Sequence, residues 1–231
     1  MAGGHVATTP LRLLPSATSR KLGLLGLASV GAILLGMVAT AIPYRGHAGE
    51  GYSPLNHFVS ELGEIAASRF ALVFNLSLVL GGIGLGVFVL LLADRLSGRF
   101  RTILMAAGVV AGASGALVGV FPMDYPPAHR IVSGLFFLTG WLVACVFSLW
   151  LLSAPRLGFP RWLLVPGATA VAISVTFLAV FSTYHQTNPD GPILSRPTGF
   201  WSVPFLEWAS LLSLLAWFVC VSIVRLRTPT E

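Results

Sequence analysis

The amino-acid sequence predicts an all-α integral membrane protein with six transmembrane helices and a short amphipathic helix at the membrane surface, at about residues 54–66. Two observations lead to this fold class. Hydrophobic residues make up 55% of the chain and charged residues only 10%, whereas a soluble domain carries roughly 25% charged residues. The apolar residues also occur in unbroken runs of about 20, which is the length of a helix that crosses a bilayer.

Six apolar runs supply the predicted spans. They cover approximately residues 22–43, 68–93, 102–122, 131–153, 161–184 and 203–224. The first run is about 20 residues long and so exceeds the 7–15 apolar residues of a cleavable signal peptide. We therefore expect it to be retained, which predicts a membrane domain over 22–225 between cytoplasmic tails at 1–21 and 226–231.

Basic residues are distributed unevenly between the two sets of connections. The N-terminal tail, the second and fourth loops and the C-terminal tail hold ten of the 14: Arg12, Arg20, Lys21, Arg95, Arg99, Arg101, Arg156, Arg161, Arg225 and Arg227. The opposite set holds Arg45, Arg69, Arg130 and Arg196. Because basic loops stay in the cytoplasm, both termini are predicted to be cytoplasmic and the protein to be a multi-pass protein of the cell (inner) membrane.

The positive charge does not indicate a nucleic-acid partner. The net charge is +6, but the basic residues lie in short clusters between apolar runs, whereas a nucleic-acid surface gathers them in one patch or stripe. Both cysteines, Cys145 and Cys220, lie inside apolar runs, where thiols pack as small hydrophobes. Membrane lipids are the expected surroundings, and no cofactor is predicted.

Glycines spaced four apart predict close helix packing. The pairs are Gly82/Gly86, Gly108/Gly112 and Gly115/Gly119. Such pairs let two helix backbones approach each other. They could also present a face to a membrane-protein partner or to a second copy of the chain.

Polar residues concentrate on the predicted extracytoplasmic side. Only two of the 8 acidic residues, Asp94 and Glu231, and one of the five histidines, His5, lie elsewhere. The stretch YSPLNHFVSELGE at 52–64 predicts a helix that begins at Ser53-Pro54. At helical spacing its polar residues share one arc of about 100°: His57, Ser60, Glu61 and Glu64. We expect this helix to lie in the outer interface, with its polar face toward water or a vestibule over the spans.

Nine residues are candidates for binding a ligand on this side. They are His57, Ser60, Glu61, Asn75, Asp124, His129, Arg130, His185 and Glu207. Ionisable groups in membrane spans are costly and mark functional or paired positions, and Glu207 lies about one turn into the sixth span. Arg130 opens the fourth span, where the helix dipole disfavours a cation. We therefore expect Arg130 to pair with Glu61, Asp124 or Glu207, with Asn75 near the same pocket.

Several motifs in this order resemble the bacterial and archaeal domain-of-unknown-function 998 membrane proteins. They are SELGE at 60–64, FNLSLVLGG at 74–82, and GVFPMD at 119–124 followed by HR at 129–130. The resemblance covers roughly residues 25–225. It implies a six-helix membrane fold and brings no reaction.

Three functions remain open from the sequence. The first is a binding or transport-type protein whose outer polar vestibule takes a lipid headgroup or another polar ligand, which Arg130 would suit. The second is a scaffold for another membrane protein, in which the polar face is only solvated. The third is a metal-assisted lipid hydrolase, since His57 and Glu61 have the spacing of two metal ligands on a helix. A metal site needs at least three ligands, and the further candidates are Asp124, His129, His185 and Glu207.

Overall fold

The computed structural model describes residues 16–153, 158–187 and 199–227, and every regular element in these ranges is a helix. The six long helices are α1 (Ser16–Ala41), α2 (Ala71–Ala93), α3 (Gly98–Val120), α4 (Pro126–Ser153), α5 (Leu164–Thr187) and α6 (Ser202–Arg227). Each is long and apolar enough to cross a membrane. The predicted six-span, all-α fold is therefore confirmed, with helix ends displaced by a few residues.

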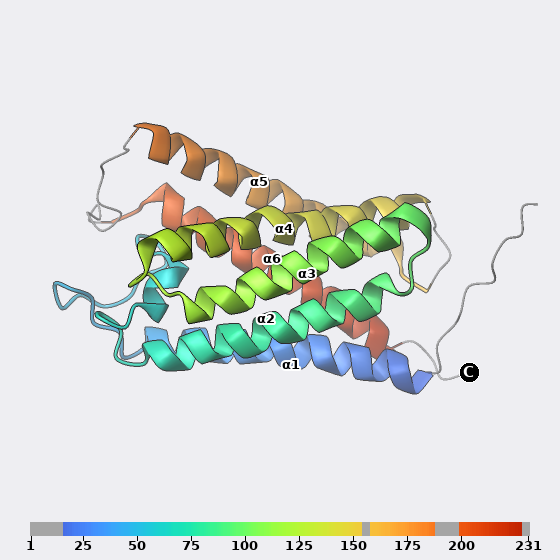
Figure 1. Cartoon of the computed structure of the whole chain (residues 1–231), viewed down its shortest axis with the longest axis horizontal. Coiled ribbons are helices and arrows are strands. Elements are labelled where there is room, and N and C mark those ends of the chain that lie inside the picture. Colours follow the sequence, from blue (N-terminus) through green and yellow to red (C-terminus); the bar gives the residue numbers. More distant parts are fainter. Residues whose placement is uncertain (1–15, 154–157, 188–198, 228–231) are drawn as a thin grey trace, which may run out of the picture.

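Successive helices run in opposite directions, so that α1 begins and α6 ends at the same end of the bundle (Figure 1). The Ser19 hydroxyl at the start of α1 donates to the Arg225 carbonyl oxygen near the end of α6, at 3.2 Å. The start of α1 and the end of α6 therefore lie side by side at one end of the bundle. Which side of the membrane this end faces stays a prediction from the basic residues, of which Arg12, Arg156 and Arg196 lie outside the described residues.

Large apolar side chains cover the outside of the bundle. Leu35, Leu72 and Val165 are each at least 70% exposed. A soluble monomer rarely presents contiguous apolar surface on this scale, whereas lipid is a favourable solvent for it. The exposure pattern thus agrees with a multi-pass membrane protein.

The predicted glycine packing is confirmed between α2 and α3. A Cβ atom at Gly86 would lie 3.2 Å from the Gly112 Cα, and one at Gly82 would contact the Ala116 backbone. The two helix axes can approach this closely only because these positions carry no side chain. These glycines therefore contact other parts of the same chain, and a protein partner or second copy stays a prediction.

The connection between α1 and α2, residues 42–70, folds over one end of the bundle, and we call it the cap. The expected helix at 54–66 is wrong in extent, because the only regular element there is the 3-10 helix η1 (Val59–Gly63). The polar arc is also buried rather than solvated: His57 is 2% exposed, Glu61 0% and Glu64 7%. By contrast, the apolar Leu55 is 49% exposed.

Candidate functional site

Three carboxylates from different parts of the chain bind backbone N–H groups of the cap. They substitute for the carbonyl acceptors of a regular helix. Within the cap, Glu61 Oε1 accepts from the Phe58 backbone N–H at 2.8 Å. From α6, Glu207 Oε2 accepts from the Val59 backbone N–H at 2.6 Å. In a longer α-helix these N–H groups would bind carbonyls four residues back. The side-chain acceptors therefore explain why η1 stays short.

The α3–α4 connection supplies the third carboxylate. Asp124 accepts from the backbone N–H groups of Ile65 at 2.8 Å and Ala66 at 3.1 Å. On α2, the Asn75 amide donates to the Gly63 carbonyl at 2.9 Å. The cap is thus fastened to α2, α6 and the α3–α4 connection by polar side chains of those elements.

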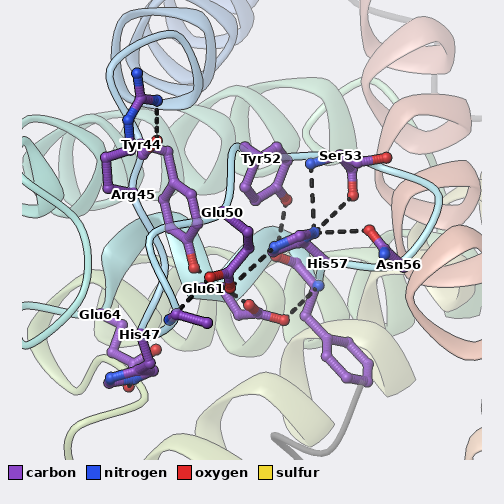
Figure 2. Close-up of polar contacts among 12 residues, drawn as sticks. Tyr44, Arg45, His47, Glu50, Tyr52, Ser53, Asn56, His57, Glu61 and Glu64 are labelled. Carbon is purple, nitrogen blue, oxygen red and sulfur yellow. Dashed lines mark hydrogen bonds and ion pairs between the residues drawn. The ribbon is translucent and has the colours of Figure 1, made fainter. Parts of the chain in front are cut away.

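His57 is the centre of a buried polar network inside the cap (Figure 2). Its ring lies beside those of Tyr44 and Tyr52, at centroid distances of 5.6 and 5.1 Å. Nδ1 lies 2.8 Å from the Asn56 side-chain oxygen, and Nε2 lies 3.7 Å from a Glu50 carboxylate oxygen. These contacts give His57 a structural role in the cap.

Two further side chains, His47 within the cap and Trp208 on α6, complete its polar contacts. His47 Nε2 lies 2.8 Å from Glu64 Oε1, as Figure 2 also shows. The Trp208 indole N–H on α6 donates to the Tyr52 hydroxyl at 2.9 Å and the His57 carbonyl at 3.2 Å. The cap therefore closes the end of the bundle at which we expected an open polar vestibule.

A cavity lies beneath the cap, between α2, α3, α4 and α6. Its volume is about 80 Å³. By the same measure one water needs about 10–15 Å³, so the cavity has room for about five to eight waters. Its walls are mostly apolar, and the glycines Gly82, Gly86 and Gly112 contribute to them. The cavity exists where α2, α3 and α4 present glycine rather than larger side chains.

Four polar residues line this cavity: Ser60, His129, Ser133 and Glu207. Glu207 is 6% exposed, and its Oε2 accepts the Val59 backbone N–H at 2.6 Å. His129 Nδ1 lies 2.9 Å from the Phe121 carbonyl oxygen. A ring nitrogen facing a carbonyl must carry the hydrogen, which makes Nε2 of the neutral ring an acceptor.

The structure separates the nine candidate residues into three groups. Ser60, His129 and Glu207 meet at the cavity. His57, Glu61, Asn75 and Asp124 hold the cap. Arg130 and His185 join neither group, since Arg130 is exposed and the His185 ring packs on Phe181 at 4.5 Å within α5.

The predicted ion pair of Arg130 is wrong. Its Nε donates to the Pro126 carbonyl at 3.4 Å, and no salt bridge within the described residues joins it to Glu61, Asp124 or Glu207. Those three carboxylates instead accept hydrogen bonds from backbone N–H groups of the cap. Arg130 stays at the exposed start of α4, where solvent can hydrate it.

Sequence reasoning missed Ser133, although a signal for it was present. It follows His129 by four residues on α4, which places both side chains on one helix face. Across the described ranges, no three His, Cys, Asp or Glu side chains converge to hold a metal ion. Nothing in that part of the chain therefore supports the metal-assisted hydrolase.

Comparison with known proteins gives a family but no activity. No curated protein and no solved structure matches the chain. A family model described as "Protein of unknown function (DUF998)" matches residues 30–224. This match covers most of the chain and confirms the resemblance seen in its motifs. The chain belongs to the DUF998 family.

Proposed function

We propose that this protein binds a lipid-like amphipathic molecule, with the apolar part in the cavity and the polar group beneath the cap. The observation that carries the proposal is a buried carboxylate at the end of an apolar cavity. Protein interiors are close-packed, and a buried polar group without a hydrogen bond is costly. A ligand would fill the space, and its polar group would lie beside the Glu207 carboxyl group that lines the cavity.

The dimensions of the cavity favour one slender chain over a complete two-chain phospholipid. Five to eight waters occupy roughly 150–240 Å³ in the liquid. The lining residues of α6 run from Glu207 to Phe218, and 11 residue steps at 1.5 Å make about 16 Å. This length is about half of the roughly 30 Å hydrocarbon core of a bilayer.

The proposed position of the ligand replaces the open vestibule expected from the sequence. The cap covers the end of the bundle, and four of the polar residues that we expected to line a vestibule bind its backbone: Glu61, Asn75, Asp124 and Glu207. We place the cap on the extracytoplasmic side because the basic residues favour the cytoplasm for the opposite end. The ligand's polar group would then lie near the outer surface of the membrane.

Two alanines on α3 provide a matched test. Ala111 lines the cavity, whereas Ala113 is exposed on the outside of the bundle. Native mass spectrometry of gently extracted protein, incubated with a total lipid extract, would compare wild type, Ala111→Phe and Ala113→Phe. Helix content and thermal unfolding would show that both variants fold.

The expected result is a bound molecule in wild type and Ala113→Phe and its loss in Ala111→Phe. Phenylalanine at 111 would occupy the space that the apolar chain needs, whereas phenylalanine at 113 would only face lipid. Equal binding by all three proteins would overturn the proposal. So would wild-type protein that carries no bound molecule after the incubation.

A further inference from the structure

We propose that Arg225 and Arg95 form a phosphate-binding site at the end of the bundle opposite the cap. Its ligand is the phosphate of a phospholipid headgroup or of a soluble phosphate compound. This end contains the last turn of α6, the end of α2 and the start of α1 (Figure 1). Neither arginine lines the cavity, so the site is separate from the one proposed above and does not depend on it.

Arg225 is a buried cation without a carboxylate partner. It lies in the last turn of α6 and is only 8% exposed. Within the ranges that the structure describes, no salt bridge joins it to an acid. Buried charges in proteins are normally paired with an opposite charge or bind an ion. The position of Arg225 therefore calls for an anion.

The connection between α4 and α5 holds the Arg225 guanidinium group in place. The guanidinium carbon lies 3.6 Å from the ring centroid of Phe159, and Nη2 donates to the Gly158 carbonyl oxygen at 2.8 Å. Phe159 in turn packs against Phe147 and Trp150, at centroid distances of 5.0 and 5.8 Å. A side chain fixed in this way loses little conformational entropy when it binds a ligand.

Most N–H donors of this guanidinium group have no protein acceptor. A guanidinium group carries five N–H donors, and the Gly158 carbonyl is the one acceptor that the described residues supply. The Nε of Arg225 is buried and has no hydrogen-bond partner there. Planar guanidinium groups bind two oxygens of one phosphate through parallel N–H bonds. A phosphate would therefore supply both the missing acceptors and the missing negative charge.

A second positive charge lies near Arg225. Arg95, just beyond the end of α2, is close enough for the two positive charges to repel each other. Its neighbour Asp94 offsets part of this charge but forms its own ion pair with Arg101, at 2.7 Å. Basic pockets between membrane helices are a known arrangement for phosphate-bearing headgroups. A bound phosphate would turn the repulsion between the two arginines into attraction.

The charge of this whole end favours an anion. Asp94 is its one acid among the described residues, and its described cations are Arg20, Lys21, Arg95, Arg99, Arg101, Arg161, Arg225 and Arg227. Such an excess of one sign attracts groups of the opposite sign. Of these cations Arg225 alone is buried, which distinguishes a defined site from a solvated basic surface.

Binding measurements on the full chain in a neutral detergent test the proposal. Native mass spectrometry would titrate the protein with dioctanoyl phosphatidylglycerol, and calorimetry would do so with inorganic phosphate at constant ionic strength. Wild type would be compared with Arg225→Met, Arg95→Gln and Arg99→Gln. Methionine keeps an unbranched side chain beside Phe159. Arg99 is the matched control, because it is an exposed arginine at the same end whose guanidinium carbon lies 5.5 Å from the Phe100 ring centroid.

We expect Arg225→Met and Arg95→Gln each to weaken binding about 10- to 100-fold, as for a lost hydrogen bond to a charged group. Arg99→Gln should weaken it by less than about fivefold, as for an exposed charge. If the lipid binds in this way and inorganic phosphate does not, the ligand is a headgroup. If inorganic phosphate binds with the same dependence on both arginines, the ligand is a soluble phosphate compound.

Equal affinities in all four proteins would overturn the proposal. So would an equal loss in Arg99→Gln, which would show only a diffuse attraction, or a wild-type protein that binds neither probe. Thermal unfolding would show which variants fold. Arg95→Gln decides the outcome if Arg225→Met does not fold, because Arg95 is only partly buried.

Discussion

Replacing Glu207 by alanine removes the acceptor that joins α6 to the cap. The bond to the Val59 N–H is 2.6 Å long, and both residues are buried, at 6% and 4% exposure. A buried donor that loses its partner costs about 1–3 kcal/mol. At 1.4 kcal/mol per factor of ten, the locally opened cap should become about 5- to 140-fold more populated.

Hydrogen–deuterium exchange of peptides that cover residues 58–66 measures this opening. We expect exchange at the Val59 amide to be faster by that factor in Glu207→Ala and to stay near the wild-type rate in Glu207→Gln, whose amide oxygen still accepts. Asp94→Ala is the control at the other end of the bundle. Asp94 pairs with Arg101 at 2.7 Å on the surface, and such a pair contributes only about 0–1 kcal/mol. Equal exchange rates in Glu207→Ala and Glu207→Gln would refute the role of this hydrogen bond.

Three further predictions concern packing, the cap and topology. Gly112→Ala should destabilise the fold by about 1–3 kcal/mol, because its Cβ would press on the Gly86 backbone; Gly134→Ala, which meets open space, should leave thermal unfolding unchanged or improve it. Asp124→Ala should raise exchange at Ile65 and Ala66 by less than tenfold, since these bonds are exposed; unchanged exchange there would contradict the anchoring role. A reporter active only in the periplasm and fused after Glu231 should stay silent, and activity would reverse the proposed orientation.

The spans and the glycine contacts could be predicted from the sequence because both depend on local composition. A run of about 20 apolar residues has few alternatives to a membrane helix, since backbone groups in lipid must be satisfied within the segment. A glycine pair such as Gly82/Gly86 similarly implies close approach of another helix, and α3 provides it. The pattern does not say which helix that is, and so it could not exclude a partner chain.

The amphipathic pattern at 52–64 was correct about the importance of this stretch and wrong about its form. Helical periodicity assumes that each backbone N–H binds a carbonyl four residues back. Here the N–H of Val59 binds the side chain of Glu207, 148 positions further along the chain, and those of Ile65 and Ala66 bind Asp124. Side-chain acceptors on other elements bind these N–H groups, so the stretch forms a buried cap and not the expected surface helix.

The sequence by itself determined the membrane class, the number of spans and the end of the bundle at which acidic residues gather, because these follow from the cost of placing charge in lipid. Only the tertiary structure decided which acids bind the backbone of the cap and which one also lines a cavity. Glu61 and Glu207 look alike in the sequence. Glu61 has both oxygens engaged by groups of the cap, whereas Glu207 lines a cavity that arises only when four helices pack around glycines. Tertiary packing determines which groups distant in the chain become hydrogen-bond partners, and local residue spacing does not predict that packing.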